Sequence, residues 1–222
     1  MTRKISVASG EFEIVLPGTW ACIPMTTPDA IRQRVAALIK KQIGVSDRLA
    51  QHRREVREQL VDASLQALAQ EALSFAISLE LVPGVPFPAS MLTSRSSWPP
   101  RARDELAGET VKERLHRAFP EAQIVSPGGV AIARVAVCGT KQFGAASTES
   151  LGLDYWLPVP EATDLMHVIV SAPMAPGYEP FIKLFDAIVG TIGWQATPAA
   201  LTRRRRRRLR PVPGACLDSL SR

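Results

Sequence analysis

Alternation of apolar and polar residues recurs along the chain and constrains its fold more than any other feature. Residues 11–16 alternate in this way and end at a Pro17-Gly18 turn. A period of two is typical of strands, and Pro-Gly pairs are typical of the turns that end them. The segments with this pattern are 11–16, 75–82, 122–125, 130–137, 151–159 and 165–172. Because short connections join antiparallel strands, the sequence predicts an antiparallel sheet.

Helices are predicted wherever apolar residues recur three or four positions apart. Pro28 and Asp29 suit a helix start, and Pro120 prevents a helix from continuing beyond residue 119. The predicted helices are 28–44, 47–72, 109–119 and 180–192. This order of elements lacks the regular alternation of strand and helix that a parallel doubly wound sheet requires. We therefore predict a single α+β domain over residues 1–197, with an antiparallel β-sheet packed against helices.

The net charge of +6 belongs entirely to the C-terminal end. Residues 203–222 hold eight basic residues and one acidic residue, so the 202 residues before them carry a net charge of −1. A near-neutral body does not support a fold-wide nucleic-acid surface. Residues 198–222 are predicted to form a disordered arginine-rich tail, because they bury too little apolar surface to offset the entropy of ordering.

The tail suggests one function of its own. Its arginines would bind nucleic acid or an anionic membrane surface through non-specific phosphate contacts. The alternative is an extension that only stays solvated. The candidate polyanion contacts are Arg203, Arg204, Arg205, Arg206, Arg207, Arg208 and Arg210.

Compartment is predicted from the absence of targeting features. No apolar stretch approaches the roughly 18 to 20 residues of a membrane helix, so no transmembrane span is expected. The basic N-terminus meets Glu11 and Glu13 before any apolar signal core develops. Cys22, Cys138 and Cys216 are far apart and form no Cys-x-x-Cys pair. We expect a cytoplasmic protein with reduced, mostly structural thiols.

Motifs for catalysis are weak in this chain. There is no phosphate-binding loop, no Gly-x-Ser-x-Gly elbow and no cluster with metal-ligand spacing, so we predict no cofactor, no metal and no catalytic residue. One enzymatic alternative is a small thiol-dependent hydrolase in which His167 activates Cys138. The plainer interpretation is a buried, inert Cys138 and a half-exposed strand histidine. Residues 138–141, Cys-Gly-Thr-Lys, are interpreted as a turn.

Trp98 is the single candidate contact residue outside the tail. It lies in a Ser-Ser-Trp-Pro-Pro sequence within residues 83–108, the proline-rich and least regular part of the body, where 90–94 is a candidate strand. A tryptophan offers a large contact area with few rotatable bonds. Trp20 and Trp194 end apolar patterns and are expected in the core. Trp98 is expected to be exposed.

Three phrases resemble a known group of proteins. They are Phe-Glu-Ile-Val-Leu-Pro-Gly-Thr-Trp at 12–20, Tyr-Trp-Leu-Pro-Val-Pro at 155–160 and Phe-Asp-Ala-Ile-Val-Gly-Thr-Ile-Gly-Trp at 185–194. Together with the element order over 10–194, they resemble uncharacterised bacterial proteins of the Mog1/PsbP-like α+β type. The resemblance includes no catalytic motif and gives the arginine tail no counterpart. It implies a small binding or assembly module.

The leading hypothesis is therefore a non-catalytic binding or assembly module with a protein partner. Polyanion binding, through the tail alone, is the first alternative. The thiol-dependent hydrolase is the second.

Overall fold

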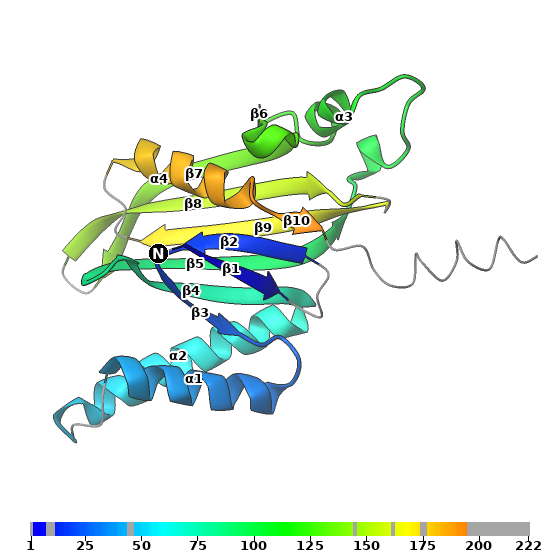
Figure 1. Cartoon of the computed structure of the whole chain (residues 1–222). Helices are drawn as coiled ribbons and strands as arrows, with labels where there is room; N and C mark the ends of the chain where they lie inside the picture. Colours follow the sequence, from blue (N-terminus) through cyan, green and yellow to red (C-terminus); the bar gives the residue numbers. More distant parts are fainter. Residues whose placement is uncertain are drawn as a thin grey trace, which may run out of the picture.

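The computed structural model describes residues 2–7, 12–43, 47–143, 146–160, 163–173 and 177–194. Its centre is a seven-stranded main sheet with the order β3-β4-β5-β9-β8-β7-β6 (Figure 1). The strands are Thr19–Ile23 (β3), Ala72–Val82 (β4), Val85–Ser97 (β5), Gln123–Val125 (β6), Ile132–Phe143 (β7), Ala146–Pro158 (β8) and Asp164–Pro173 (β9). All neighbours pair antiparallel. The predicted α+β fold with an antiparallel sheet is confirmed.

A small sheet and one helix cover what we call the front face of the main sheet. The small sheet has the order β1-β2-β10, from Thr2–Val7, Phe12–Pro17 and Gly193–Trp194. Phe12, Ile14 and Leu16 of β2 are buried in one cluster with Phe185 and Ile188 of helix α4, Tyr178–Val189. The apolar sides of β2 and α4 therefore face the main sheet, as their sequence periods predict.

Helices cover the opposite, back face at its two sides (Figure 1). Along β3 and β4, Ile31 and Val35 of α1 pack with Phe75 and Ile77 of β4. At the other side, Leu115 of α3 packs near β7. The helices are Pro28–Ile43 (α1), Ala50–Ala69 (α2) and Val111–Ala118 (α3), with short 3₁₀ turns at Asp47–Leu49 (η1), Pro100–Ala102 (η2) and Pro127–Gly129 (η3).

Strand β5 corrects the prediction that residues 83–108 are irregular. It spans Val85–Ser97, far beyond the candidate strand 90–94, and crosses the middle of the sheet. Pro86 and Pro88 are accommodated because pairing with β9 begins only at Ser90. Before that residue β5 pairs with β4 alone, so an edge-like segment tolerates prolines that donate no hydrogen bond.

A buried polar network fixes α4 on the front face. The Tyr155 hydroxyl of β8 donates to Asp186 Oδ1 at 2.9 Å, and Arg134 Nη1 of β7 donates to Asp186 Oδ2. Arg134 Nη2 also donates to Gln123 Oε1 of β6. The Arg134 and Asp186 side chains are only 10% and 18% exposed. Burial, and then the nearby Asp186 carboxylate, raise the pKa of Tyr155 far above its ordinary value, so this hydroxyl stays a donor.

We predict that Asp186 matters more to stability than Tyr155. Asp186→Asn leaves the buried Arg134 guanidinium without its counter-charge and lowers the free energy of unfolding by about 3 kcal/mol. Tyr155→Phe keeps the ion pair and costs about 1 kcal/mol. Urea denaturation at neutral pH measures both changes. Equal losses in the two variants would contradict a dominant role for the charge pair.

A close backbone approach joins η3 to the end of α4. Gly128 has φ of +65°, and a Cβ atom there would lie 2.6 Å from the carbonyl oxygen of Gly190. Gly129 has φ of +85°, but a Cβ atom there would have no neighbour within 4 Å. Both conformations favour glycine, and only Gly128 also needs the space.

We predict that Gly128→Ala destabilises the protein by about 1 to 2 kcal/mol more than Gly129→Ala, because only the first substitution adds a steric clash. Gly129→Ala is the matched control for the cost of a positive φ. Thermal and urea unfolding of both variants provide the comparison. A difference within experimental error would refute the clash.

Candidate functional site

A cavity of about 620 Å³ lies where α3 meets the ends of β7 and β8. Its walls come from the segment after β5, the first turn of α3, residues 129–131 before β7 and residues 158–160 after β8. This volume falls within the range of roughly 300 to 1,000 Å³ that is usual for small-ligand sites. Lining residues include Trp98, Glu109, Val111, Arg114 and Val130.

Trp98 lines this cavity, and the prediction that it is exposed is wrong. Its side chain is 6% exposed and packs in a cluster with Leu115 and Leu165. The Arg114 guanidinium lies 4.1 Å from the centre of the ring, a cation–π geometry. Pro99 and Pro100, which suggested an exposed loop in the sequence, instead begin the 3₁₀ turn η2, whose Ala102 is buried in the same cluster as Trp98. The role of Trp98 as a contact residue stays a prediction.

Arg114 holds the segment between η2 and α3 in place. Its Nε donates to the carbonyl of Ala102 at 3.1 Å, and its Nη2 donates to the carbonyl of Arg103 at 2.7 Å. Nη1 lies 3.3 Å from Glu105 Oε2. The Arg114 side chain therefore donates hydrogen bonds to two backbone carbonyl oxygens in the segment that precedes α3.

Arg117, one turn further along α3, adds a second set of such bonds. It makes a two-pronged ion pair with Glu109, with N–O distances of 2.8 and 2.6 Å. It also donates to the carbonyls of Arg101 and Asp104. This pairing lowers the pKa of Glu109 below its ordinary value of 4.5 and outweighs the opposing effect of burial. The wall of the cavity is thus built on charge-assisted hydrogen bonds.

The first turn of α3 is closed by a capping box. Thr110 Oγ1 accepts from the Glu113 backbone N–H at 3.3 Å, and the Glu113 carboxylate accepts from the Thr110 N–H at 2.8 Å. Hydrogen bonds from Thr110 lower the pKa of Glu113. The Thr-x-x-Glu spacing could have placed this helix start from sequence alone. The carboxylates of Glu105, Glu109 and Glu113 are therefore all engaged in ion pairs or hydrogen bonds.

The mouth of the cavity has an apolar rim. Val111 and Val130 line the cavity and are 52% and 45% exposed. Leu106, in the turn that precedes α3, is also 56% exposed, and its carbonyl accepts from the Glu109 N–H at 3.0 Å. Large apolar side chains gathered around an opening mark a surface that binds an apolar group. Sequence reasoning missed Val111 and Val130, since nothing in a local pattern shows that these two positions line one cavity.

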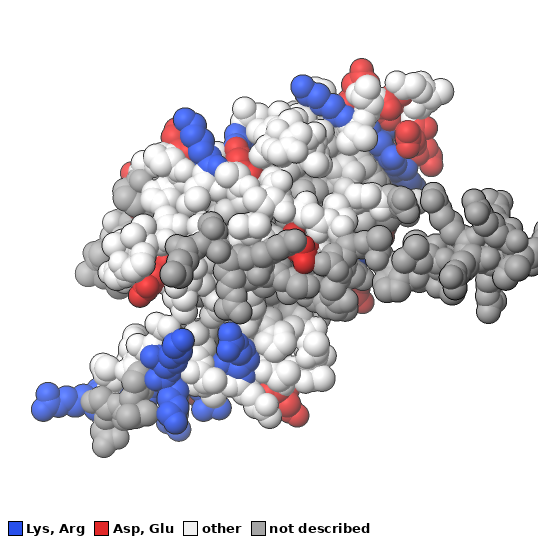
Figure 2. Space-filling view, viewed as in Figure 1, with Lys and Arg blue, Asp and Glu red and all other residues white. Residues whose placement is uncertain are grey.

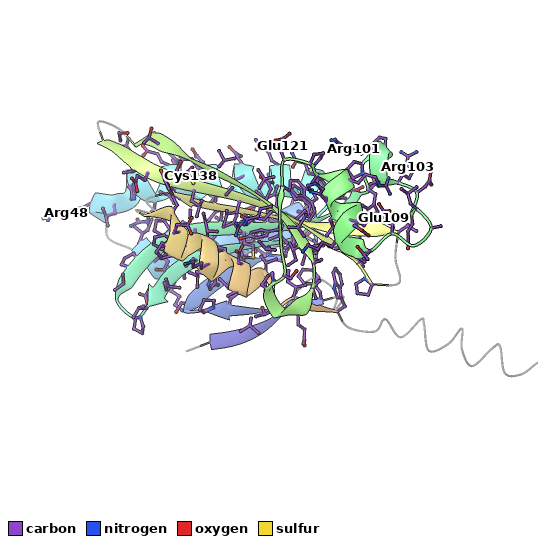
Figure 3. All side chains as sticks on the ribbon, turned by 90° about the horizontal axis from the view of Figure 1, so that it is seen from above. Arg48, Arg101, Arg103, Glu109, Glu121 and Cys138 are labelled. Atoms are coloured by element: carbon purple, nitrogen blue, oxygen red, sulfur yellow. The ribbon has the colours of Figure 1, made fainter. Side chains whose placement is uncertain are left out.

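The structure does not bring Cys138 and His167 together. Cys138 lies opposite Leu151, whose side chain is buried on the front face, whereas His167 lies opposite Trp156 on the back face. Figure 3 shows Cys138 toward the end of the molecule away from Glu109. Cys138 is also exposed, against the expectation of burial. Residues 138–141 continue strand β7, so the predicted turn is wrong.

His167 belongs to a stack of rings on the back face. Its imidazole lies 4.8 Å from the Trp156 ring with 7° between the planes, and Trp156 stacks on Phe119 at 4.4 Å. Its Nε2 lies 2.8 Å from Asp154 Oδ1. The His167 ring is thus held between the Trp156 ring and the Asp154 carboxylate.

Other predictions concern metals, membranes and the tail. Within the described residues, no group of three or more His, Cys, Asp or Glu is placed to hold a metal ion. No helix in the same ranges has the length and apolar character needed to cross a membrane. The predicted polyanion contacts Arg203 to Arg208 and Arg210 lie outside the described residues.

Comparisons with known proteins give little further information. No protein-family model matches the chain, and no curated protein matches it significantly. One similar solved structure is a crystal structure from Bacteroides thetaiotaomicron VPI-5482 at 1.50 Å resolution, with a TM-score of 0.44 and 9% sequence identity. The similarity covers 88% of this chain and 49% of that chain, so this chain spans about half of its length.

We predict that pH controls how firmly the cavity wall is held. Folding lowers the pKa of Glu109, so the ionised carboxylate stabilises the folded state above pH 4.5. This stabilisation is lost as the pH falls through the lower pKa of the folded protein. Glu109→Gln therefore lowers Tm at neutral pH, and the Tm difference from wild type shrinks below pH 4.5. Thermal unfolding across pH measures this difference. Glu121→Gln, at an exposed carboxylate, serves as the control and changes Tm little (Figure 3). A Tm difference for Glu109→Gln that does not change with pH would be the contrary result.

Proposed function

We propose that this chain is a non-catalytic binding module that takes an apolar group of its ligand or protein partner into the cavity between α3, β7 and β8. We call this cavity, which Trp98 lines, the Trp98 cavity. The observation that carries the proposal is the cavity of about 620 Å³ together with the exposed Val111 and Val130 at its mouth. Covering these side chains removes apolar surface from water, which favours association by roughly 25 cal/mol per Å² before the costs of binding.

The chemistry of the cavity supports binding over catalysis. A general acid or base needs a titratable group that is free to exchange a proton with a bound molecule. The nearby carboxylates of Glu105 and Glu109 are instead paired with Arg114 and Arg117. The non-catalytic role also agrees with the resemblance to Mog1/PsbP-like proteins, which we include in the proposal together with a cytoplasmic location.

The two alternatives differ in their support. The thiol-dependent hydrolase loses its basis, because Cys138 and His167 lie on opposite faces of the main sheet. Polyanion binding by the arginine tail rests on its sequence and stays a prediction. The two binding activities do not compete, since the tail acts through charge and the cavity through apolar contact.

The proposal is tested with the uncharged dye Nile red, whose emission reports an apolar environment. We expect saturable binding that Val111→Glu or Val130→Glu weakens by about tenfold, because a carboxylate at the mouth must be desolvated. Val82→Glu is the matched control, since Val82 is similarly exposed at 56% but lies at the distal turn between β4 and β5. It should leave the affinity within about twofold of wild type.

Two results would count against this function. Equal weakening by Val82→Glu and Val111→Glu would indicate general surface adsorption of the dye. A wild-type protein that binds no Nile red would show that the cavity does not accept apolar groups. Circular dichroism of each variant checks that the fold is intact.

A further inference from the structure

Positive charge in the folded body is concentrated on the α1–α2 helix pair. Residues 28–69 hold eight basic and five acidic residues, a net charge of +3. The other residues before 203 carry 11 basic and 15 acidic residues, a net charge of −4. Figure 2 shows Lys and Arg side chains gathered over α1 and α2. The near-neutral body is therefore strongly polarised, which the overall net charge conceals.

A groove of about 710 Å³ runs between these two helices. Its basic residues lie one or two turns apart on α1 and on α2, so each helix presents them on one side. The basic lining residues are Arg32, Lys40, Arg53, Arg54 and Arg57. Glu58 and Asp62 are the acidic lining residues. The groove thus has a net positive charge, although it is lined by both basic and acidic side chains.

The ion pairs Arg32–Asp29 and Arg54–Glu58 beside the groove are solvent-exposed and contribute little stability. Arg32 pairs with Asp29 at 3.0 Å, and the two side chains are 50% and 86% exposed. Arg54 lies 3.9 Å from Glu58, with exposures of 81% and 68%. Exposed pairs of this kind contribute about 0 to 1 kcal/mol. A partner's carboxylates can therefore replace them at little cost.

The floor of the groove favours a protein segment over a nucleic acid. Ala36, Ile39 and Val61 provide apolar contact between the charged rims. Residues 28–69 contain no Phe, Tyr or Trp on which a base would stack. Glu58 and Asp62 would repel a continuous phosphate chain but can pair with Lys or Arg of a protein partner.

We propose that the α1–α2 groove binds an amphipathic helix of an acidic protein partner. The α2 side of the groove extends from Ala50 to Asp62, which is roughly 18 Å along a helix and matches about three turns of a bound helix. Apolar residues of that helix would cover the floor and its carboxylates would face the arginines, the helix-in-groove mode of recognition. The arginine tail has the wrong sign to occupy this groove itself.

The test uses the full-length chain and a synthetic peptide of about 16 residues, with Leu and Ala on one helical face and Glu on the other. A scrambled peptide of the same composition is the first control. The groove variant is Arg54→Glu with Arg57→Glu. The matched variant is Lys41→Glu with Arg48→Glu, at an exposed residue of α1 and an exposed residue of η1 that do not line the groove. Both double variants change the net charge equally and keep the arginine tail.

We expect the amphipathic peptide to bind at least about tenfold more tightly than the scrambled one, and the groove variant to abolish this preference. The matched variant should keep it within about threefold. Equal binding of the two peptides, or equal losses in both variants, would overturn the proposal. A single-stranded RNA whose binding falls only in the groove variant would also overturn it in favour of a nucleic acid. None of these outcomes depends on the Trp98 cavity.

Discussion

The buried ion pair between Arg134 and Asp186 links helix α4 to strands at the side of the main sheet. Arg134 reaches from β7 to α4 and to Gln123 of β6, so one guanidinium joins the front helix to two strands at the side of the sheet. The end of α4 in turn contacts η3 through Gly128 and Gly190. Since η3 leads into Val130, the way in which α4 is fixed also affects the position of Val130 at the cavity.

The two proposed binding surfaces lie at opposite sides of the main sheet and differ in their chemistry. The Trp98 cavity lies by the ends of β7 and β8 and has an apolar mouth, whereas the basic groove lies along α1 and α2 beside β3 and β4. An apolar pocket contributes affinity mainly through buried area, and a charged groove contributes association rate and orientation. A partner that reached both surfaces would bind more tightly than through one surface alone, because the second contact would form at a high effective concentration once the first had formed.

Sequence periodicity predicted the fold well where a strand or helix buries one side. The alternation around Ile14 and the helical period around Phe185 gave the correct elements, because each pattern directly reflects burial. Prediction failed at β5, where Pro86 and Pro88 suggested an irregular segment. Whether a proline is tolerated depends on which neighbour pairs beside it, and that is a tertiary property.

The candidate site could be predicted only in part. Trp98 was found because it is a large aromatic residue in a loop-like sequence, yet its burial depends on Leu115, Leu165 and the Arg114 guanidinium. The basic groove was hidden for a different reason. Summing charge over 202 residues gave −1, since the positive helix pair and the acidic remainder nearly cancel.

The pairing of β2 with β10 has a consequence for how the chain acquires its structure. Phe12 lies opposite Trp194, and their rings are 6.1 Å apart, so residues 182 positions apart complete the same small sheet. Contacts between such distant positions form late, because a long loop must close before they gain any stability. During synthesis the apolar side of β2 therefore remains unprotected by β10 until the ribosome has made nearly all of the α+β domain.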